Sequence, residues 1–126
     1  MEDKLKANAE LVVQQMSKVA DMQFGYDRQS IEWLEGFIER QRTREDINQE
    51  KIDGMISTLG SYLGETIIRC HGGKWKNVDG QWCVQLNEGG SAFPFNKVRK
   101  QFANGREDSI GSFFDVIPKL SQIRNT

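Results

Sequence analysis

Apolar residues recur every three or four positions over the first 70 residues of the chain, which is the period of an amphipathic helix. This pattern predicts three helices, over residues 3–20, from about Ser30 to the charged run at 39–46, and over residues 48–70. Gly25 is expected to stop the first helix, and the Ser30 hydroxyl is expected to cap the second.

The third predicted helix is the longest, and we expect it to form the centre of the core. At 100° per residue, its apolar stripe consists of Ile52, Met55, Ile56, Leu59, Leu63, Thr66, Ile67 and Cys70. Gly60, Gly64 and His71 lie on the shoulder of this stripe, whereas Glu65 and Arg69 lie on the opposite side. Because glycine costs a helix roughly 1 kcal/mol relative to alanine, this pair of glycines predicts another element packed close to the backbone.

After residues 72–73, which are both glycine, the apolar residues no longer follow the helical period but recur at every second position, as in a strand. Asp79-Gly80 separates two alternating segments and is a strong signal for a two-residue hairpin, since both positions need positive φ. The register of such a hairpin pairs Trp75 with Val84. We therefore expect one face, with Trp75, Trp82, Val84 and Leu86, to pack on the long helix, and the other, with Cys83, to be wetter.

The C-terminal third is expected to contain a third strand and two short helices. The strand covers residues 92–95, with Pro94 at a sheet edge because proline cannot donate to a ladder. Asn96 is expected to cap the first helix, and Asp108 or Ser109 to start the second. The fold class is thus α+β in one domain over the whole chain: three N-terminal helices, a small antiparallel sheet of a hairpin plus an edge strand, and two short C-terminal helices.

The order of several short motifs is also informative. IEWLEGFIERQR, LGSYLGE, GGKW, GQWCVQL and FPFNKVRKQFANGREDSI follow one another over about residues 30–117. This arrangement resembles a family of small bacterial proteins of unknown function, with an LGxxLGE helix, a G-x-W strand and a PF-x-K-V segment followed by NG and DSI. The resemblance implies a compact α+β domain of bacterial origin, and it brings no reaction and no catalytic residues.

Composition and charge narrow the function classes. The net charge is −1, from 17 basic and 18 acidic residues, which disfavours a general nucleic-acid binder because such a protein needs a basic surplus. Basic residues alternate with aromatic ones between 74 and 106, yet the hairpin register puts Trp75 and Trp82 on the face away from Lys74 and Lys76. No run of about 20 apolar residues predicts a membrane span, and the N-terminus does not resemble a signal peptide, so we expect a cytoplasmic protein with free cysteines.

The residues with reactive side chains do not form a catalytic or metal-binding pattern. Glu65 precedes Arg69 by one turn, where an ion pair stabilises a helix by ~0.2–0.5 kcal/mol, and it lies about 120° from His71 around the helix. Cys70 is expected to point inward, and its neighbour His71 diverges from it by about 100°. Cys70, His71 and Cys83 match no common zinc spacing, so we expect no metal site. We also expect no catalytic residue and no cofactor.

The function class that remains is the binding of another molecule. Without a nucleophile, base and orienting group in one place, the leading hypothesis is a non-enzymatic module that binds another protein, such as an immunity or inhibitor-type protein. The alternative is a small enzyme or ligand-binding protein with a pocket near Glu65 and His71. The candidate ligand- or partner-binding residues are Glu65, Arg69, His71 and Trp33, the last on the flank of the second helix. The sequence does not specify an oligomeric state.

Overall fold

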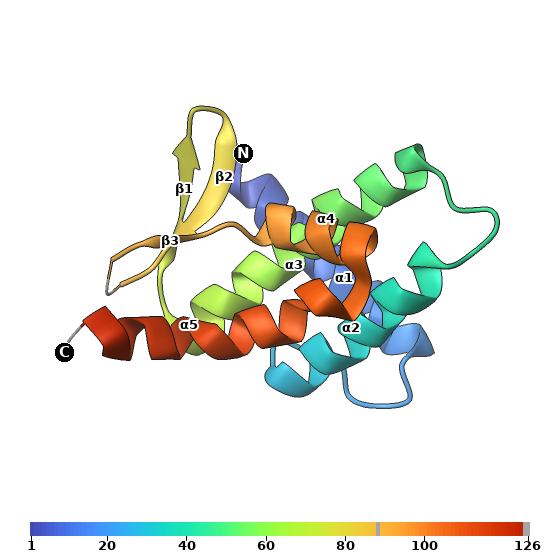
Figure 1. Cartoon of the computed structure of the whole chain (residues 1–126), viewed down its shortest axis with the longest axis horizontal. Helices are drawn as coiled ribbons and strands as arrows, with labels where there is room; N and C mark the ends of the chain where they lie inside the picture. Colours follow the sequence, from blue (N-terminus) through green and yellow to red (C-terminus); the bar gives the residue numbers. More distant parts are fainter. Residues whose placement is uncertain (88, 125–126) are drawn as a thin grey trace.

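The computed structural model describes residues 1–87 and 89–124, of which residues 120–124 are described by their backbone alone. Within them the elements are α1 (Glu2–Val19), α2 (Arg28–Arg42), α3 (Gln49–His71), β1 (Lys74–Val78), β2 (Gln81–Gln85), β3 (Ser91–Ala92), α4 (Pro94–Asn104), the short 3₁₀ helix η1 (Gly105–Asp108) and α5 (Ile110–Arg124). Three helices precede a small antiparallel sheet and two follow it (Figure 1), which confirms the expected α+β fold.

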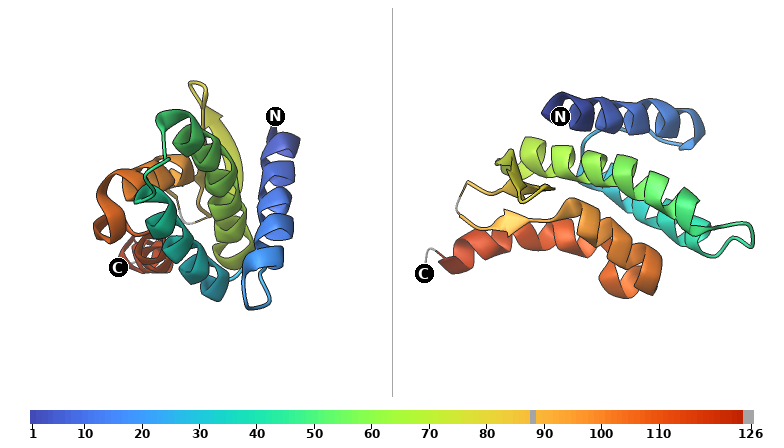
Figure 2. Two further views of the ribbon diagram at one scale, coloured as in Figure 1. Left: turned by 90° about the vertical axis from the view of Figure 1, so that its right-hand side faces the viewer. Right: turned by 90° about the horizontal axis from the view of Figure 1, so that it is seen from above.

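Helix α3 lies at the centre of the arrangement. Figure 2 shows α1 along one side of α3 and α4 with α5 along the other, and the hairpin β1–β2 lies near the C-terminal half of α3. Every residue from Gly60 to Ile67 is buried, so this part of the helix is covered on all sides rather than along one stripe. The single apolar stripe predicted from the sequence therefore understates how much of α3 is in the core.

The helix starts differ in one respect from the prediction. The side chain of Asp27 caps α2 by accepting a hydrogen bond from the Ser30 backbone N–H at 2.8 Å. Ser30 is buried inside the first turn, where its hydroxyl accepts a hydrogen bond from the Gly25 N–H, so it is not the N-cap. Asp27 is favoured because its carboxylate reaches the free amides of the first turn. Helix α1 ends at Val19, before Gly25.

The hairpin has the predicted turn and register. Asp79 and Gly80 both have positive φ, at 52° and 85°, and Trp75 pairs with Val84. The third strand is shorter than expected, because β3 covers only Ser91–Ala92 and α4 begins at Pro94. Proline suits the first position of a helix, where its missing N–H would have no partner in any case.

The two faces of β2 are not divided as the sequence predicted. Cys83, expected on the wetter face, is fully buried, whereas Trp82, expected in the core, is only half-buried. Strand β2 is the middle strand of the order β1-β2-β3 and contacts both α3 and α4. Both of its faces therefore meet other elements, and a simple inside-outside alternation does not apply.

A buried polar network holds α4 and α5 against α2. The fully buried Gln101 donates from Nε2 to the Glu35 carbonyl and the Glu39 carboxylate, and its Oε1 accepts from the Ile110 N–H. The Glu35 carboxylate accepts hydrogen bonds from the Ser109 hydroxyl and the Gly111 N–H at the start of α5. Since buried polar groups must be paired, this network sets the position of α4 relative to the rest of the fold.

Candidate functional site: a groove at the hairpin tip

Glu65 is buried, which corrects the expectation that it points into solvent. Its Oε2 accepts a hydrogen bond from Trp75 Nε1 at 2.7 Å, and its Oε1 lies 3.6 Å from Arg69 Nε. The expected ion pair with Arg69 is therefore present, but Trp75 also covers this side of α3. Both oxygens of the carboxylate have partners inside the protein.

Arg69 lies between Glu65 and an aromatic ring. Its guanidinium carbon is 3.7 Å from the centroid of the Tyr26 ring, a distance at which the ring attracts a cation. The Tyr26 hydroxyl in turn donates to Glu10 Oε2 at 3.1 Å. Burial, followed by this hydrogen bond to a carboxylate, raises the pKa of Tyr26 to about 12. Arg69 thus links α3 to the segment between α1 and α2.

His71 is the last residue of α3 and contacts a different element. Its ring centroid is 4.4 Å from that of Phe114 on α5, and its buried Nε2 has no hydrogen-bond partner among the described residues. Burial lowers the pKa of His71 from its ordinary value of 6.5. The pocket of about 250 Å³ beside Glu65 is lined by Glu2, Lys6, Glu65, Ile68, Gly73, Lys74 and Trp75, without His71.

Trp33 is half-buried on the flank of α2. Its ring meets the edge of Phe24 with centroids 5.7 Å apart and stacks on Phe37 at 5.8 Å, and the Arg40 guanidinium lies 5.5 Å from its centroid. A continuous row of ring contacts leads from Trp33 to Arg69 through Phe24, Tyr62 and Tyr26. Trp33 and Arg69 are therefore connected through the core rather than across one open surface.

The two cysteines are free, and their positions are the reverse of those expected. Cys70 is exposed near the end of α3, beyond the fully covered stretch, and Cys83 is buried in the middle strand. Desolvation raises the pKa of the Cys70 thiol. Among the residues that the structure describes, no group of three or more His, Cys, Asp or Glu side chains is placed to hold a metal ion.

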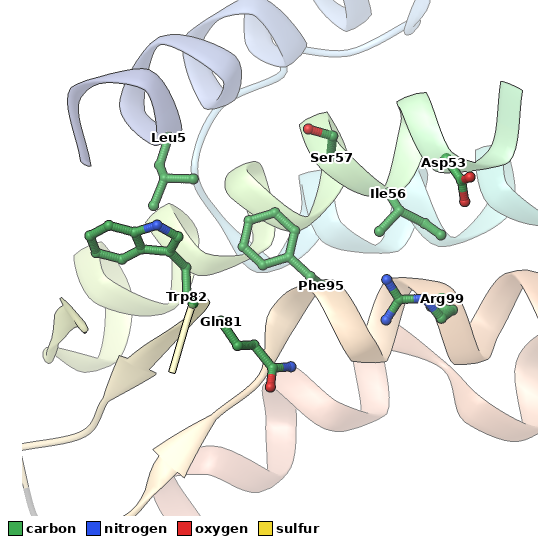
Figure 3. A pocket seen from close by; sticks show the side chains of 9 residues that line it. Leu5, Asp53, Ile56, Ser57, Gln81, Trp82, Phe95 and Arg99 are labelled. Carbon is green, nitrogen blue, oxygen red and sulfur yellow. The ribbon is translucent and has the colours of Figure 1, made fainter. Parts of the chain in front are cut away.

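A larger hollow lies at the tip of the hairpin, and we call it the hairpin groove. It has a volume of about 540 Å³ and is lined by Leu5, Asp53, Ile56, Ser57, Gly80, Gln81, Trp82, Phe95 and Arg99. These residues come from α1, α3, the hairpin and α4, which converge there (Figure 3). The groove has more than twice the volume of the pocket beside Glu65, which is about 250 Å³.

Phe95 is fixed at the centre of the groove by the backbone of α3. A Cβ added at Gly60 would overlap the Phe95 ring, so only glycine lets the ring lie this close to the helix. Leu5 and Ile56, both buried, pack nearby as part of the same core, whereas Phe95 and Trp82 are half-buried. The result is an apolar surface that packs on α3 on its inner side and is open to solvent on the other.

The groove has one apolar end and one polar end. In Figure 3, Leu5 and Trp82 lie on one side of Phe95, and Asp53 and Arg99 lie on the other. Asp53 Oδ1 accepts a hydrogen bond from Gln49 Nε2 at 2.8 Å. The guanidinium of Arg99 makes neither an ion pair nor a hydrogen bond with the side chains and backbone of residues 1–87 and 89–119, and the residue is exposed. Such a mixture of apolar surface and a few polar groups is typical of binding sites, whose volumes are about 300–1,000 Å³.

Three of the basic residues that the sequence places among aromatic ones, Lys74, Lys76 and Lys97, have different surroundings. Lys97 Nζ lies 3.3 Å from Asp108 Oδ1, so its charge is partly neutralised. Lys74 and Lys76 are exposed on β1, while Trp75 between them is buried against α3. Single-strand binders need bases to stack on exposed aromatic rings beside such charges, and this strand does not offer that combination.

The sequence does not predict the groove, because its alternating pattern places Trp82 in the core. One signal did point toward it: the spacing of Gly60 and Gly64 predicted close neighbours, and these are Phe95 and Trp75. The contribution of Leu5, Asp53 and Arg99 carries no local signal, since each lies on a different helix and only the tertiary fold brings them together.

Two further findings bear on function. No helix in the described part of the chain combines the length and the apolarity needed to cross a membrane. Comparisons of the chain with protein-family models, with curated proteins and with solved structures find no match. The resemblance noted in the sequence therefore remains a prediction, and functional reasoning depends on the site itself.

Proposed function

We propose that this chain is a non-enzymatic protein-binding module of a bacterial cytoplasm, of the immunity or inhibitor type, and that a segment of its partner occupies the hairpin groove. The observation that supports this proposal is the groove itself, in which two half-buried aromatic rings, Trp82 and Phe95, are presented on well-packed elements. Aromatic residues in such positions dominate the energetics of protein interfaces.

The alternative, an enzyme or ligand-binding protein with its site near Glu65 and His71, has weaker support. The Glu65 carboxylate already interacts with Trp75 and Arg69, and His71 packs on Phe114. A general base must be within hydrogen-bond reach of a substrate proton, and the Glu65 oxygens are engaged inside the fold. We therefore favour the binding function over this alternative.

A pull-down from a lysate of the source organism tests the proposal. Tagged wild-type protein and the variants Trp82→Ala and Val19→Ser are compared, with thermal melting used to check that each variant is folded. Val19 is an apolar side chain that is 68% exposed and does not line the groove, so its variant is the matched control. We expect one partner at stoichiometric yield with the wild type and with Val19→Ser, and its loss with Trp82→Ala.

Two results would contradict the proposal: recovery of no stoichiometric partner, or equal recovery with the folded Trp82→Ala variant. A toxin gene adjacent to the gene for this chain would support the inhibitor form of the function in particular. If the alternative function were correct, Glu65→Gln would abolish ligand binding or activity while Trp82→Ala would leave it intact.

A further inference from the structure

We propose that the partner segment presents a large apolar side chain with an acidic residue beside it. The apolar side chain packs on Phe95 between Leu5 and Trp82, and the carboxylate pairs with Arg99. This inference rests on the proposed function, since it specifies the chemistry of the segment that the hairpin groove accepts.

The apolar half of this inference follows from how the ring of Phe95 is held. Gly60 lies directly beneath the ring, and Trp75 lies beside it with centroids 6.0 Å apart, so the ring has solid contacts on its inner side. Its remaining exposed surface faces the groove together with that of Trp82 (Figure 3). Covering such apolar surface is favourable because it is removed from water, and a preformed binding surface adds little ordering cost.

The acidic residue of the proposed segment is inferred from the charge of Arg99 at the polar end of the hairpin groove. Several other basic residues interact with partners inside the fold: Arg28 with Asp115, Arg69 with Glu65, Lys97 with Asp108 and Arg42 with the carbonyls of α4. Arg99 makes no such interaction with the described side chains, yet it lines the groove beside the apolar surface. A guanidinium is suited to a carboxylate because its donors match both oxygens.

Asp53 makes this preference directional. It lies at the same end of the groove as Arg99 and is held by Gln49. A second carboxylate beside Asp53 would be repelled, so the acidic group of the partner must approach Arg99 from the side nearer to Trp82 and Gln81. Removing the negative charge with Asp53→Asn is therefore expected to strengthen the binding of an acidic segment.

A displayed library of random 12-residue peptides, selected on the full chain, tests this chemistry. Selections are run on wild type, Arg99→Glu, Trp82→Ala and Lys100→Glu, the last being a matched control because Lys100 is exposed on the same helix and does not line the groove. We expect wild type and Lys100→Glu to enrich peptides with an aromatic or large aliphatic residue and an Asp or Glu nearby. Arg99→Glu should shift the enrichment to Lys or Arg.

One enriched peptide is then synthesised in acidic and amide forms. Replacing its Glu or Asp by Gln or Asn should weaken binding to wild type by about three- to tenfold, and leave binding to Arg99→Glu unchanged or improved. Asp53→Asn should bind the acidic form about two- to threefold more tightly than wild type does.

The outcomes separate the two proposals. Peptides that require Trp82 but show no acidic preference, or whose binding is unaffected by Arg99→Glu, would overturn the inference and leave the groove as a binding site. A selection with no enrichment that depends on Trp82 would overturn both the inference and the assignment of the groove.

Discussion

Two aromatic rings pack on glycines of the same helix that are four residues apart, and the two rings differ in their exposure to solvent. Trp75 lies over Gly64 and Phe95 lies over Gly60, and in both cases an added Cβ would overlap the ring. The Trp75 side is closed, since the indole is 6% exposed and its N–H donates to Glu65. The Phe95 side remains half open at the hairpin groove.

The difference shows that close packing on a glycine does not by itself determine whether a ring is buried in the core or available to a binding partner. At Gly64 the ring has a polar group that finds its partner in the core, so the contact closes the structure. At Gly60 the ring has no polar group, and the neighbouring elements leave part of its surface uncovered. A ring that is packed on one side and uncovered on the other is suited to contact another molecule. The following predictions test this contrast.

The largest effect is expected for Gly64→Leu. The added side chain would have to displace the buried Trp75 ring, and we expect a loss of about 3 kcal/mol or more in the free energy of unfolding. Urea denaturation measures it, with Gly54→Leu as the control because no described atom lies within 4 Å of a Cβ added at Gly54. An unchanged free energy of unfolding for Gly64→Leu would refute the packing contact.

Glu65→Ala should come next, because it leaves the indole N–H of Trp75 buried without an acceptor. Such a group costs about 1–3 kcal/mol, whereas Glu65→Gln keeps an acceptor and should cost less than about 1 kcal/mol. Chemical denaturation of the two variants compares them directly. Equal losses would show that the ion pair with Arg69 matters more than the hydrogen bond to Trp75.

The two alanine variants of the glycines sharpen the contrast itself. Phe95 is half-buried and can shift toward the groove when a methyl group is added at Gly60, whereas Trp75 is enclosed and cannot. We expect Gly64→Ala to be less stable than Gly60→Ala by about 1–2 kcal/mol. Gly60→Ala should instead weaken partner binding in the pull-down. Similar stabilities of the two variants would mean that both rings are equally confined.

A smaller, pH-dependent effect is expected at His71, whose buried Nε2 has no hydrogen-bond partner in the part of the chain that the structure describes. Burial lowers the pKa of His71 in the folded state, so the unfolded chain binds its proton more readily. The contribution of His71 to stability is therefore present above pH 6.5 and is lost as the pH falls below that value. Denaturation midpoints at pH 7.5 and 5.5 should differ less for His71→Phe than for wild type. An identical difference in both proteins would exclude His71 as the source.

The smallest effect is expected for Gly54→Ala, and it has the opposite sign. Gly54 is a helical glycine, and none of the described residues packs over its backbone, so the substitution should stabilise the protein by about 0.5–1 kcal/mol through helix propensity alone. Thermal denaturation suffices to measure it. A loss of stability would contradict this prediction and would indicate that Gly54 also has a packing role.

Local patterns in the sequence predicted most of the fold. The period of apolar residues gave three N-terminal helices, and Asp79-Gly80 gave the turn and the register of the hairpin. The predicted start of α4 was wrong. Pro94 fits either an edge strand or a first helical turn, and the local sequence does not distinguish the two. Asp27 and Ser30 are both good capping residues, and the structure selects Asp27.

The candidate site was predicted much less well than the fold. Trp82 and Cys83 were assigned to the wrong environments because both faces of β2 meet other elements. Glu65 was expected in solvent because α3 was treated as a helix with one inner face, yet the hairpin closes its other side through Trp75. Arg99 and Asp53 are ordinary surface charges in the sequence, and their place in a groove comes from segments that are distant along the chain.

Most of the helices and the hairpin of this protein follow from local sequence alone, because helix period, turn residues and the cost of helical glycine act within a few positions of one another. The sequence also showed that something must lie close to Gly60 and Gly64. Which of these neighbours closes the core with Glu65, and which one borders a groove, depends on how the distant elements pack. Exposure at a position is set by which distant elements pack over it, and that is decided when the whole chain is folded.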